Sequence, residues 1–192
     1  PNMPALVEKG MSCLVCNKFT SKKNIRLSTM LFKKVGEIIW LKKESDIDKI
    51  TAVSGSGPAY YFLFIQFLEL AAKELGLSSA IAKKLVYQTA FGSMKLLEND
   101  QRTAKQLQET IAVKGGTTEA AIKVLNHNNL FKKIIKKAIK EAFKHSIKLG
   151  KYWLMKKLRA IIAIKTLDFL KINKWDSISI EGIYKRSKIT KI

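Results

Sequence analysis

A chain of 192 residues with 47% hydrophobic and 27% charged side chains is long enough to bury one core and a small second unit. This composition excludes a disordered protein. Gln66 and Glu69 interrupt the most apolar stretch, so we expect no membrane-spanning helix. The first residues do not have the pattern of a signal peptide, and the expected location is the cytoplasm.

The net charge of +21 is typical of proteins that bind nucleic acid or anionic membranes. Arginine, which makes bidentate contacts with bases and phosphates, is nevertheless rare among the 36 basic residues and occurs only at Arg26, Arg102, Arg159 and Arg186. Lysine, isoleucine and asparagine have A/T-rich codons, which is a second explanation for the charge. We expect no specific nucleic-acid partner, and a basic nucleic-acid or membrane-surface binder remains an alternative.

Residues 1–42 are expected to form a short α/β segment. Residues 11–15 are an extended apolar run, residues 24–34 have helical periodicity that ends at Gly36, and residues 38–41 are a short buried strand. Strand, helix, strand is the order found at the close of an α/β domain. Nowhere in this chain does a strand lead into the G-x-G-x-x-G turn that holds dinucleotide phosphates.

Cys13 and Cys16 form a C-x-x-C pattern without a second pair, and His127 and His145 lie far along the chain. A structural zinc site needs four ligands, so we expect no metal site. Residues three apart in a strand face opposite sides, which separates the thiols. We expect two reduced, partly buried cysteines.

The stretch Ser54, Gly55, Ser56, Gly57 and Pro58 stands before the most apolar run of the chain. Proline suits the first helical position, so a helix is predicted over residues 58–75, with Ser56 or Gly57 as its cap. The helix is apolar on nearly every side and therefore needs cover all round.

From residue 43 to residue 150 the pattern is helical. Helices are expected over residues 46–53, 58–75, 79–99, 103–112, 117–126 and 131–149, the last one closing at Gly150. The fold class is mainly α, a helical domain preceded by the α/β segment. So much apolar surface in about 105 residues favours self-association.

A second glycine-rich helix start occurs at Gly115, Gly116, Thr117 and Thr118. First-turn N–H groups lack helical partners and, together with the helix dipole, favour a bound anion. Two such starts suggest a small anionic ligand, and the alternative is that both are ordinary helix caps.

Four blocks of the sequence, residues 1–7, 32–40, 54–60 and 115–118, resemble pyrroline-5-carboxylate reductases in order and spacing. The resemblance covers residues 1 to about 150, and the nucleotide-binding half that opens the family's chain is missing. It implies NADPH- or NADH-dependent reduction of 1-pyrroline-5-carboxylate to L-proline, in a homodimer that can assemble further into rings. The cofactor would be bound mainly by the missing half, and the isolated chain is expected to be inactive without it.

The resemblance also implies roles for individual residues. Gly115, Gly116, Thr117 and Thr118 would form the turn that anchors the substrate carboxylate, with the Thr118 hydroxyl near the reacting nitrogen as the catalytic group. Glu44 would border the substrate pocket, and Asn2 would lie near the cofactor. The stretch from Ser54 to Pro58 would lie near the site.

This chain departs from the family pattern at two places. Val113 and Lys114 replace a Ser-Pro pair before the two glycines, which removes a hydroxyl and a rigid residue from the loop. Met3 replaces a threonine near the expected nicotinamide position.

Residues 151–192 lie outside the resemblance. Residues 152–170 could form a basic amphipathic helix for a membrane surface, and an accidental extension of the reading frame is the alternative. For the chain as a whole, a non-catalytic helical oligomerisation fragment is the alternative to a reductase.

Overall fold

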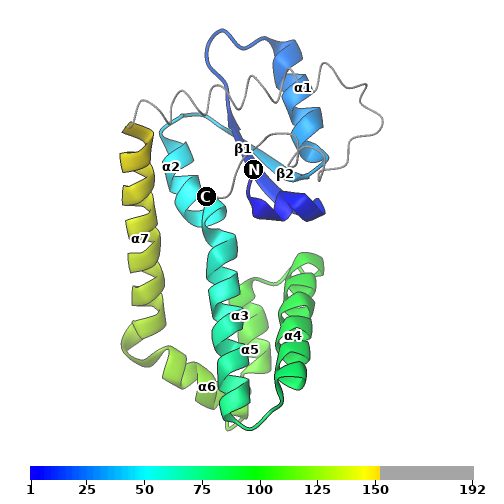
Figure 1. Ribbon diagram of the computed structural model, residues 1–192, viewed down its shortest axis with the longest axis vertical. Coiled ribbons are helices and arrows are strands. Elements are labelled where there is room, and N and C mark those ends of the chain that lie inside the picture. The colour runs from blue at the N-terminus through cyan, green and yellow to red at the C-terminus, as the bar shows by residue number, and fades with distance from the viewer. Residues whose placement is uncertain (152–192) are drawn as a thin grey trace. The chain divides into compact units, whose positions relative to one another are not determined.

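The computed structural model describes residues 1–151, which are mostly helical and contain one small parallel sheet (Figure 1). The predicted fold class is confirmed. The described residues divide into two compact units, residues 1–58 together with residues 140–151, and residues 59–139. The predicted helix over residues 152–170 and the role of residues 152–192 lie outside the described part.

The first unit opens with a strand, helix and strand, as predicted. A 3-10 turn, Met3–Val7, precedes β1 (Gly10–Val15), α1 (Lys22–Lys33) and β2 (Gly36–Leu41). The strands pair in parallel from Gly10↔Gly36 to Val15↔Leu41. Ser21 caps α1 by accepting a hydrogen bond from the Asn24 N–H at 3.2 Å. Trp40 Nε1 donates to Thr29 Oγ1 at 3.0 Å, which ties β2 to α1.

Glycine is required where the two strands begin. Gly36 has φ +137°, and a Cβ there would lie 2.4 Å from the Gly10 nitrogen. A Cβ on Gly10 would in turn lie 2.7 Å from the Ala5 Cβ. Only two residues without side chains let the strands and the 3-10 turn approach this closely.

The chain from residue 46 to residue 57 does not contain the separate helix start that the sequence predicted. Helix α2 (Asp46–Ile50) runs into a π-helical turn, Thr51–Gly55, and α3 (Gly57–Glu74) follows directly. Ser56 is right-handed helical at φ −83° and ψ −18°, and its N–H donates to the Thr51 carbonyl at 2.9 Å. The prediction was wrong because Pro58 fits a helix continuing from a π turn as well as a first turn.

The apolar helix α3 is largely uncovered by the rest of the described chain. Tyr61, Phe62 and Phe67 are 62%, 58% and 55% exposed. The next helix, α4 (Ser79–Asn99), has the predicted bounds, because Gly76 at φ +91° ends α3 and Ser78 caps α4. Its exposed side chains include Leu85 and Phe91, so this helix adds further uncovered apolar surface.

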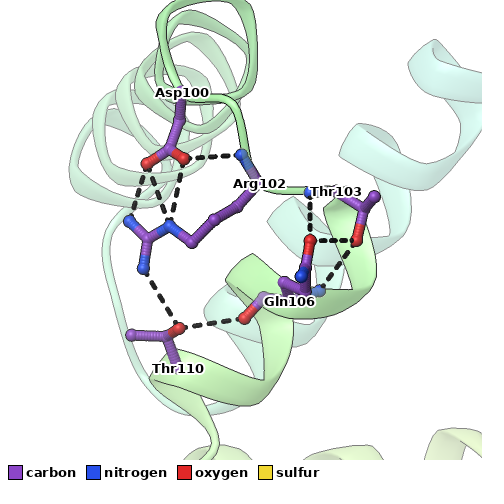
Figure 2. Close-up of polar contacts among 5 residues, drawn as sticks. All are labelled: Asp100, Arg102, Thr103, Gln106 and Thr110. Carbon is purple, nitrogen blue, oxygen red and sulfur yellow. Dashed lines mark hydrogen bonds and ion pairs between the residues drawn. The ribbon is translucent and has the colours of Figure 1, made fainter.

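The connection from α4 to α5 (Ala104–Ile111) is fixed by a polar cluster of five residues (Figure 2). Arg102 binds both carboxylate oxygens of Asp100, at 2.6 Å from Nη2 and 3.0 Å from Nε, and its Nη1 donates to Thr110 Oγ1 at 3.2 Å. Thr103 and Gln106 form a complete capping box, in which each side chain binds the other residue's backbone N–H. The N–H groups of Thr103 and Gln106 therefore both have side-chain acceptors at the start of α5.

The last described elements are α6 (Thr117–Leu125), a 3-10 turn at His127–Asn129 and α7 (Leu130–Lys151). Phe131 of α7 packs near Phe64 of α3, with ring centroids 6.3 Å apart. The buried Ser146 hydroxyl donates to Asp48 Oδ1 at 2.6 Å, which ties α7 to α2. The helix continues through Gly150, so the prediction that Gly150 closes it is wrong. None of the described helices has the length and hydropathy needed to cross a bilayer.

The Asp100 cluster predicts a pH dependence. Hydrogen bonds from the Arg102 side chain, and then from its backbone, lower the pKa of Asp100 from 3.8 to about 2. Because the folded-state pKa lies below the unfolded value, the cluster stabilises the fold at neutral pH, and this contribution is lost as the pH falls through about 2. NMR titration of the Asp100 carboxyl should show that low midpoint.

Arg102→Gln should return the Asp100 midpoint toward its ordinary value of 3.8. Lys105→Gln is the matched control, because Lys105 pairs only with the exposed Glu109 at 3.6 Å. A wild-type midpoint near 3.8 would show that the cluster does not form in solution.

Candidate functional site

A tight turn over residues 113–116 leads into α6. Gly115 has φ +76°, a left-handed conformation that favours glycine. The Gly116 N–H donates to the Val113 carbonyl at 3.0 Å, and the Gly115 N–H donates to Glu119 Oε2 at 2.8 Å. The loop is thus bonded at both glycines.

The first turn of α6 has no side-chain cap. Gly116 occupies the N-cap with φ −82° and ψ 164° and has no side chain to accept a hydrogen bond. The first backbone bond of the helix runs from the Ala120 N–H to the Gly116 carbonyl at 3.2 Å. The N–H groups of Thr117, Thr118 and Glu119 precede that bond, so they have no helical acceptor and are available to an anion.

The structure reduces the set of backbone N–H groups that could hold a substrate carboxylate. The sequence placed Gly115 and Gly116 among the substrate-binding residues, but both of their N–H groups already have protein acceptors. The available donors are the N–H groups of Thr117, Thr118 and Glu119. Of the two threonines, Thr118 is half-buried and Thr117 is exposed. The glycines contribute backbone conformation to the turn.

Glu119, which the sequence analysis did not select, is bonded into this turn. The Gly115 N–H first, and the Lys123 ammonium 3.3 Å from Oε1 second, lower the pKa of its carboxyl. A capping box is recognised by Ser or Thr three residues before Glu or Gln. Gly116 stands at that position here, so the usual signal was absent.

Asn2 connects three segments of the first unit. Its Nδ2 donates to the Ser54 carbonyl at 3.0 Å and to Ser54 Oγ at 3.2 Å, and its Oδ1 accepts from the Met11 N–H at 2.9 Å. Two of the blocks that carry the family resemblance, residues 1–7 and 54–60, are therefore in direct contact. The expected proximity of Asn2 to a cofactor stays a prediction.

The described residues do not fit a dinucleotide site by themselves. Both ends of the Asn2 side chain are bonded within the protein, and the sheet in the described part consists of β1 and β2 alone. Neither strand is followed by a G-x-G-x-x-G turn.

The stretch from Ser54 to Pro58 does not form a second anion-binding helix start. The Ser56 N–H is bonded to Thr51, and proline has no N–H to offer. Gly55 belongs to the π-helical turn, and Gly57 is buried at the first position of α3. Of the two predicted helix starts, only the one at α6 leaves first-turn donors available in the described chain.

Glu44 and the cysteines lie in the first unit. Glu44 is exposed just before α2, and its carbonyl accepts from the Ile47 N–H at 3.0 Å. Its role at the substrate pocket stays a prediction.

Cys13 and Cys16 are free thiols, the first half-buried and the second exposed, so the expectation that both are partly buried is wrong for Cys16. Burial raises the pKa of the Cys13 thiol.

Fold and site together define a mostly helical domain with much exposed apolar surface and a glycine turn before α6, preceded by a βαβ segment. The family described as "Pyrroline-5-carboxylate reductase dimerisation" matches residues 44–149. The chain belongs to the pyrroline-5-carboxylate reductase family.

Individual relatives agree with this assignment. The pyrroline-5-carboxylate reductase of Pseudomonas aeruginosa is 41% identical over 67% of this chain and 47% of its own length. That of Pasteurella multocida is 39% identical over 68% of this chain and 48% of its own length. The chain thus spans about half the length of these relatives.

Solved structures show the same fold. A pyrroline-5-carboxylate reductase from Coxiella burnetii has a TM-score of 0.74 and 38% identity, covering 79% of this chain and 56% of the other. The Plasmodium falciparum pyrroline carboxylate reductase, solved with NADP bound, has a TM-score of 0.71 and 34% identity, covering 79% of this chain and 61% of the other.

Proposed function

We propose that this chain is the substrate-binding and dimerisation part of an NAD(P)H-dependent reductase that converts 1-pyrroline-5-carboxylate to L-proline. The observation that carries the proposal is the turn at α6, where the N–H groups of Thr117 and Thr118 are free, in a chain of this family. The NADP in the Plasmodium falciparum structure supports the cofactor class.

The reaction reduces a C=N bond next to a ring carbon that carries a carboxylate. The nicotinamide would supply the hydride when bound. In the proposal, the Thr117 and Thr118 N–H groups hold the carboxylate at the positive end of the α6 dipole. The Thr118 hydroxyl hydrogen-bonds the ring nitrogen as it changes from imine to amine, and fixed donors of this kind stabilise the reacting geometry.

The proposed domain boundaries follow the family pattern. Residues 1–42 would be the end of the cofactor domain, residues 43–150 the helical domain, and residues 151–192 an unmatched tail. The family match over residues 44–149 supports this division. Glu44 would border the pocket at the start of the helical domain. A cytoplasmic location is also part of the proposal, and the free thiols of Cys13 and Cys16 are usual there.

The proposed partner is a second copy of this chain, and rings of dimers are a further possibility implied by the family. We expect a dimer at micromolar concentration, because the exposed aromatic side chains of α3 need cover that the single chain does not provide. Sedimentation equilibrium measures the mass directly. Phe67→Glu should shift the population toward monomer, with Lys105→Glu on α5 as a surface control, and a well-folded wild-type monomer would contradict the proposal.

A catalytic test requires the nucleotide-binding half of a relative, fused before Pro1 or supplied as a separate chain. NADPH oxidation that depends on 1-pyrroline-5-carboxylate is the expected result. In the fused protein, Thr118→Val should raise the barrier by about 1–3 kcal/mol, seen mainly in kcat, because it removes the hydrogen bond to the nitrogen.

Val113→Ser combined with Lys114→Pro is the companion variant and should leave activity equal or higher, since it restores the usual loop of the family. A folded fusion that binds NADPH but is inactive with and without this change would exclude the catalytic assignment. The non-catalytic oligomerisation fragment would then be the better description of the chain.

A basic nucleic-acid or membrane-surface binder is tested separately by salt titration of binding to DNA or liposomes.

A further inference from the structure

Two helices of the second unit begin in different ways, and the difference bears on the substrate anchor. At α5, the Thr103 side chain accepts from the Gln106 N–H at 3.3 Å, and the Gln106 side chain accepts from the Thr103 N–H at 2.8 Å (Figure 2). The hydroxyl therefore occupies a first-turn donor. The equivalent donor at α6 is the Glu119 N–H, which has no such acceptor, whereas the N–H groups of the first two residues lack a helical acceptor at both helices.

At α6, half of that arrangement is present. Glu119 occupies the position equivalent to Gln106, three residues after the N-cap, but Gly116 has no hydroxyl. The Glu119 carboxylate reaches back past Gly116 and accepts from the Gly115 N–H at 2.8 Å. The loop is thus held from the helix side while no side chain covers the Thr117 and Thr118 N–H groups.

The Glu119 bond restricts a loop that has no proline. The residues before α6 are Val113, Lys114, Gly115 and Gly116, and none of them has the fixed φ of proline. Two hydrogen bonds close it instead, from Gly116 to Val113 and from Gly115 to Glu119. Lys123, 3.3 Å from the other carboxylate oxygen of Glu119, offsets the negative charge of that side chain beside an anion site.

We infer that Glu119 is a positioning residue, which fixes the Gly115 turn so that the Thr117 and Thr118 N–H groups remain directed at a substrate carboxylate. This inference rests on the proposed function for the identity of the ligand. The geometry requires a side chain long enough to bring an acceptor oxygen to the Gly115 N–H, and it does not require that this oxygen be charged.

Three variants separate the effect of the length of the Glu119 side chain from the effect of its charge. Glu119→Gln keeps an acceptor oxygen at the same distance and removes the charge. Glu119→Asp keeps the charge, is well tolerated in the first turn of a helix, and is one methylene too short. Glu119→Ala removes both. Glu109→Ala is the matched control, because Glu109 lies on the neighbouring helix and pairs only with exposed Lys105.

The experiment uses the 192-residue chain labelled with ¹⁵N, and L-proline as the probe. Hydrogen exchange of the Gly115 amide measures the bond to Glu119. The L-proline Kd is obtained from shifts of the Thr117 and Thr118 amides, with pyrrolidine as the control that lacks a carboxylate. In the wild type, L-proline should shift these amides and pyrrolidine should not.

Glu119→Asp and Glu119→Ala should each speed Gly115 exchange and weaken L-proline binding by about 3- to 10-fold, the change expected for one lost hydrogen bond. Glu119→Gln and Glu109→Ala should stay within about 2-fold of wild type in both measurements. If the two shortened variants match Glu109→Ala, the inference is overturned. If Glu119→Gln weakens binding as much as Glu119→Asp, charge and not reach is responsible, and the inference is again overturned.

The two proposals fail in different ways. If L-proline does not shift the Thr117 and Thr118 amide signals of the wild-type chain, the proposed substrate site is wrong. The Gly115 exchange rates in the same samples would still decide whether Glu119 fixes the turn. Should Glu119→Ala fail to fold, Glu119→Asp decides the result alone.

Discussion

The apolar surface of α3 and α4 is the constraint on which the rest of this structure depends. Hydrophobic side chains are buried only at Ala52, Ala82 and Leu107 in the described part of the chain, whereas the aromatic residues of α3 are exposed. A helical domain with so little core is stable when a partner covers the surface. The family description of this region as a dimerisation domain agrees with that requirement. The proposed second copy of this chain would supply that cover.

The helices predicted over residues 79–99 and 103–112 agree well with α4 and α5. The structure shows that Ser78 and Thr103 cap these helices, and hydroxyl caps act locally, so such starts can be recognised from the sequence. The βαβ order of residues 10–41 was also visible from the alternation of apolar runs. These features depend on residues that are close together in the sequence, so one sequence is enough to predict them.

Features that depend on distant contacts were not predicted. The π-helical turn at Thr51–Gly55 joins α2 to α3, which the sequence analysis predicted as two separate helices. Asn2 is hydrogen-bonded to this turn from 52 residues away. Gly150 continues its helix near the contact of Ser146 with Asp48, which are 98 residues apart. In each case packing within the first unit outweighs a local signal.

The role of the candidate site stays a prediction. Its glycine and threonine residues form one turn in the structure, but which of their amides are free depends on hydrogen bonds that the sequence does not display. Glu119 was missed because glycine stands where the capping box has a hydroxyl. A glycine N-cap followed by glutamate is a modified capping box, which holds its loop and leaves its first amides available.

A crystal structure of the chain grown with L-proline tests the central claim most directly. The carboxylate should lie within hydrogen-bonding distance of the Thr117 and Thr118 nitrogens, about 2.7–3.2 Å, with the ring nitrogen near the Thr118 hydroxyl. The Gly115 N–H should still be bonded to Glu119. Proline bound elsewhere, or a carboxylate held by the Gly115 or Gly116 N–H in place of its present acceptor, would contradict this account.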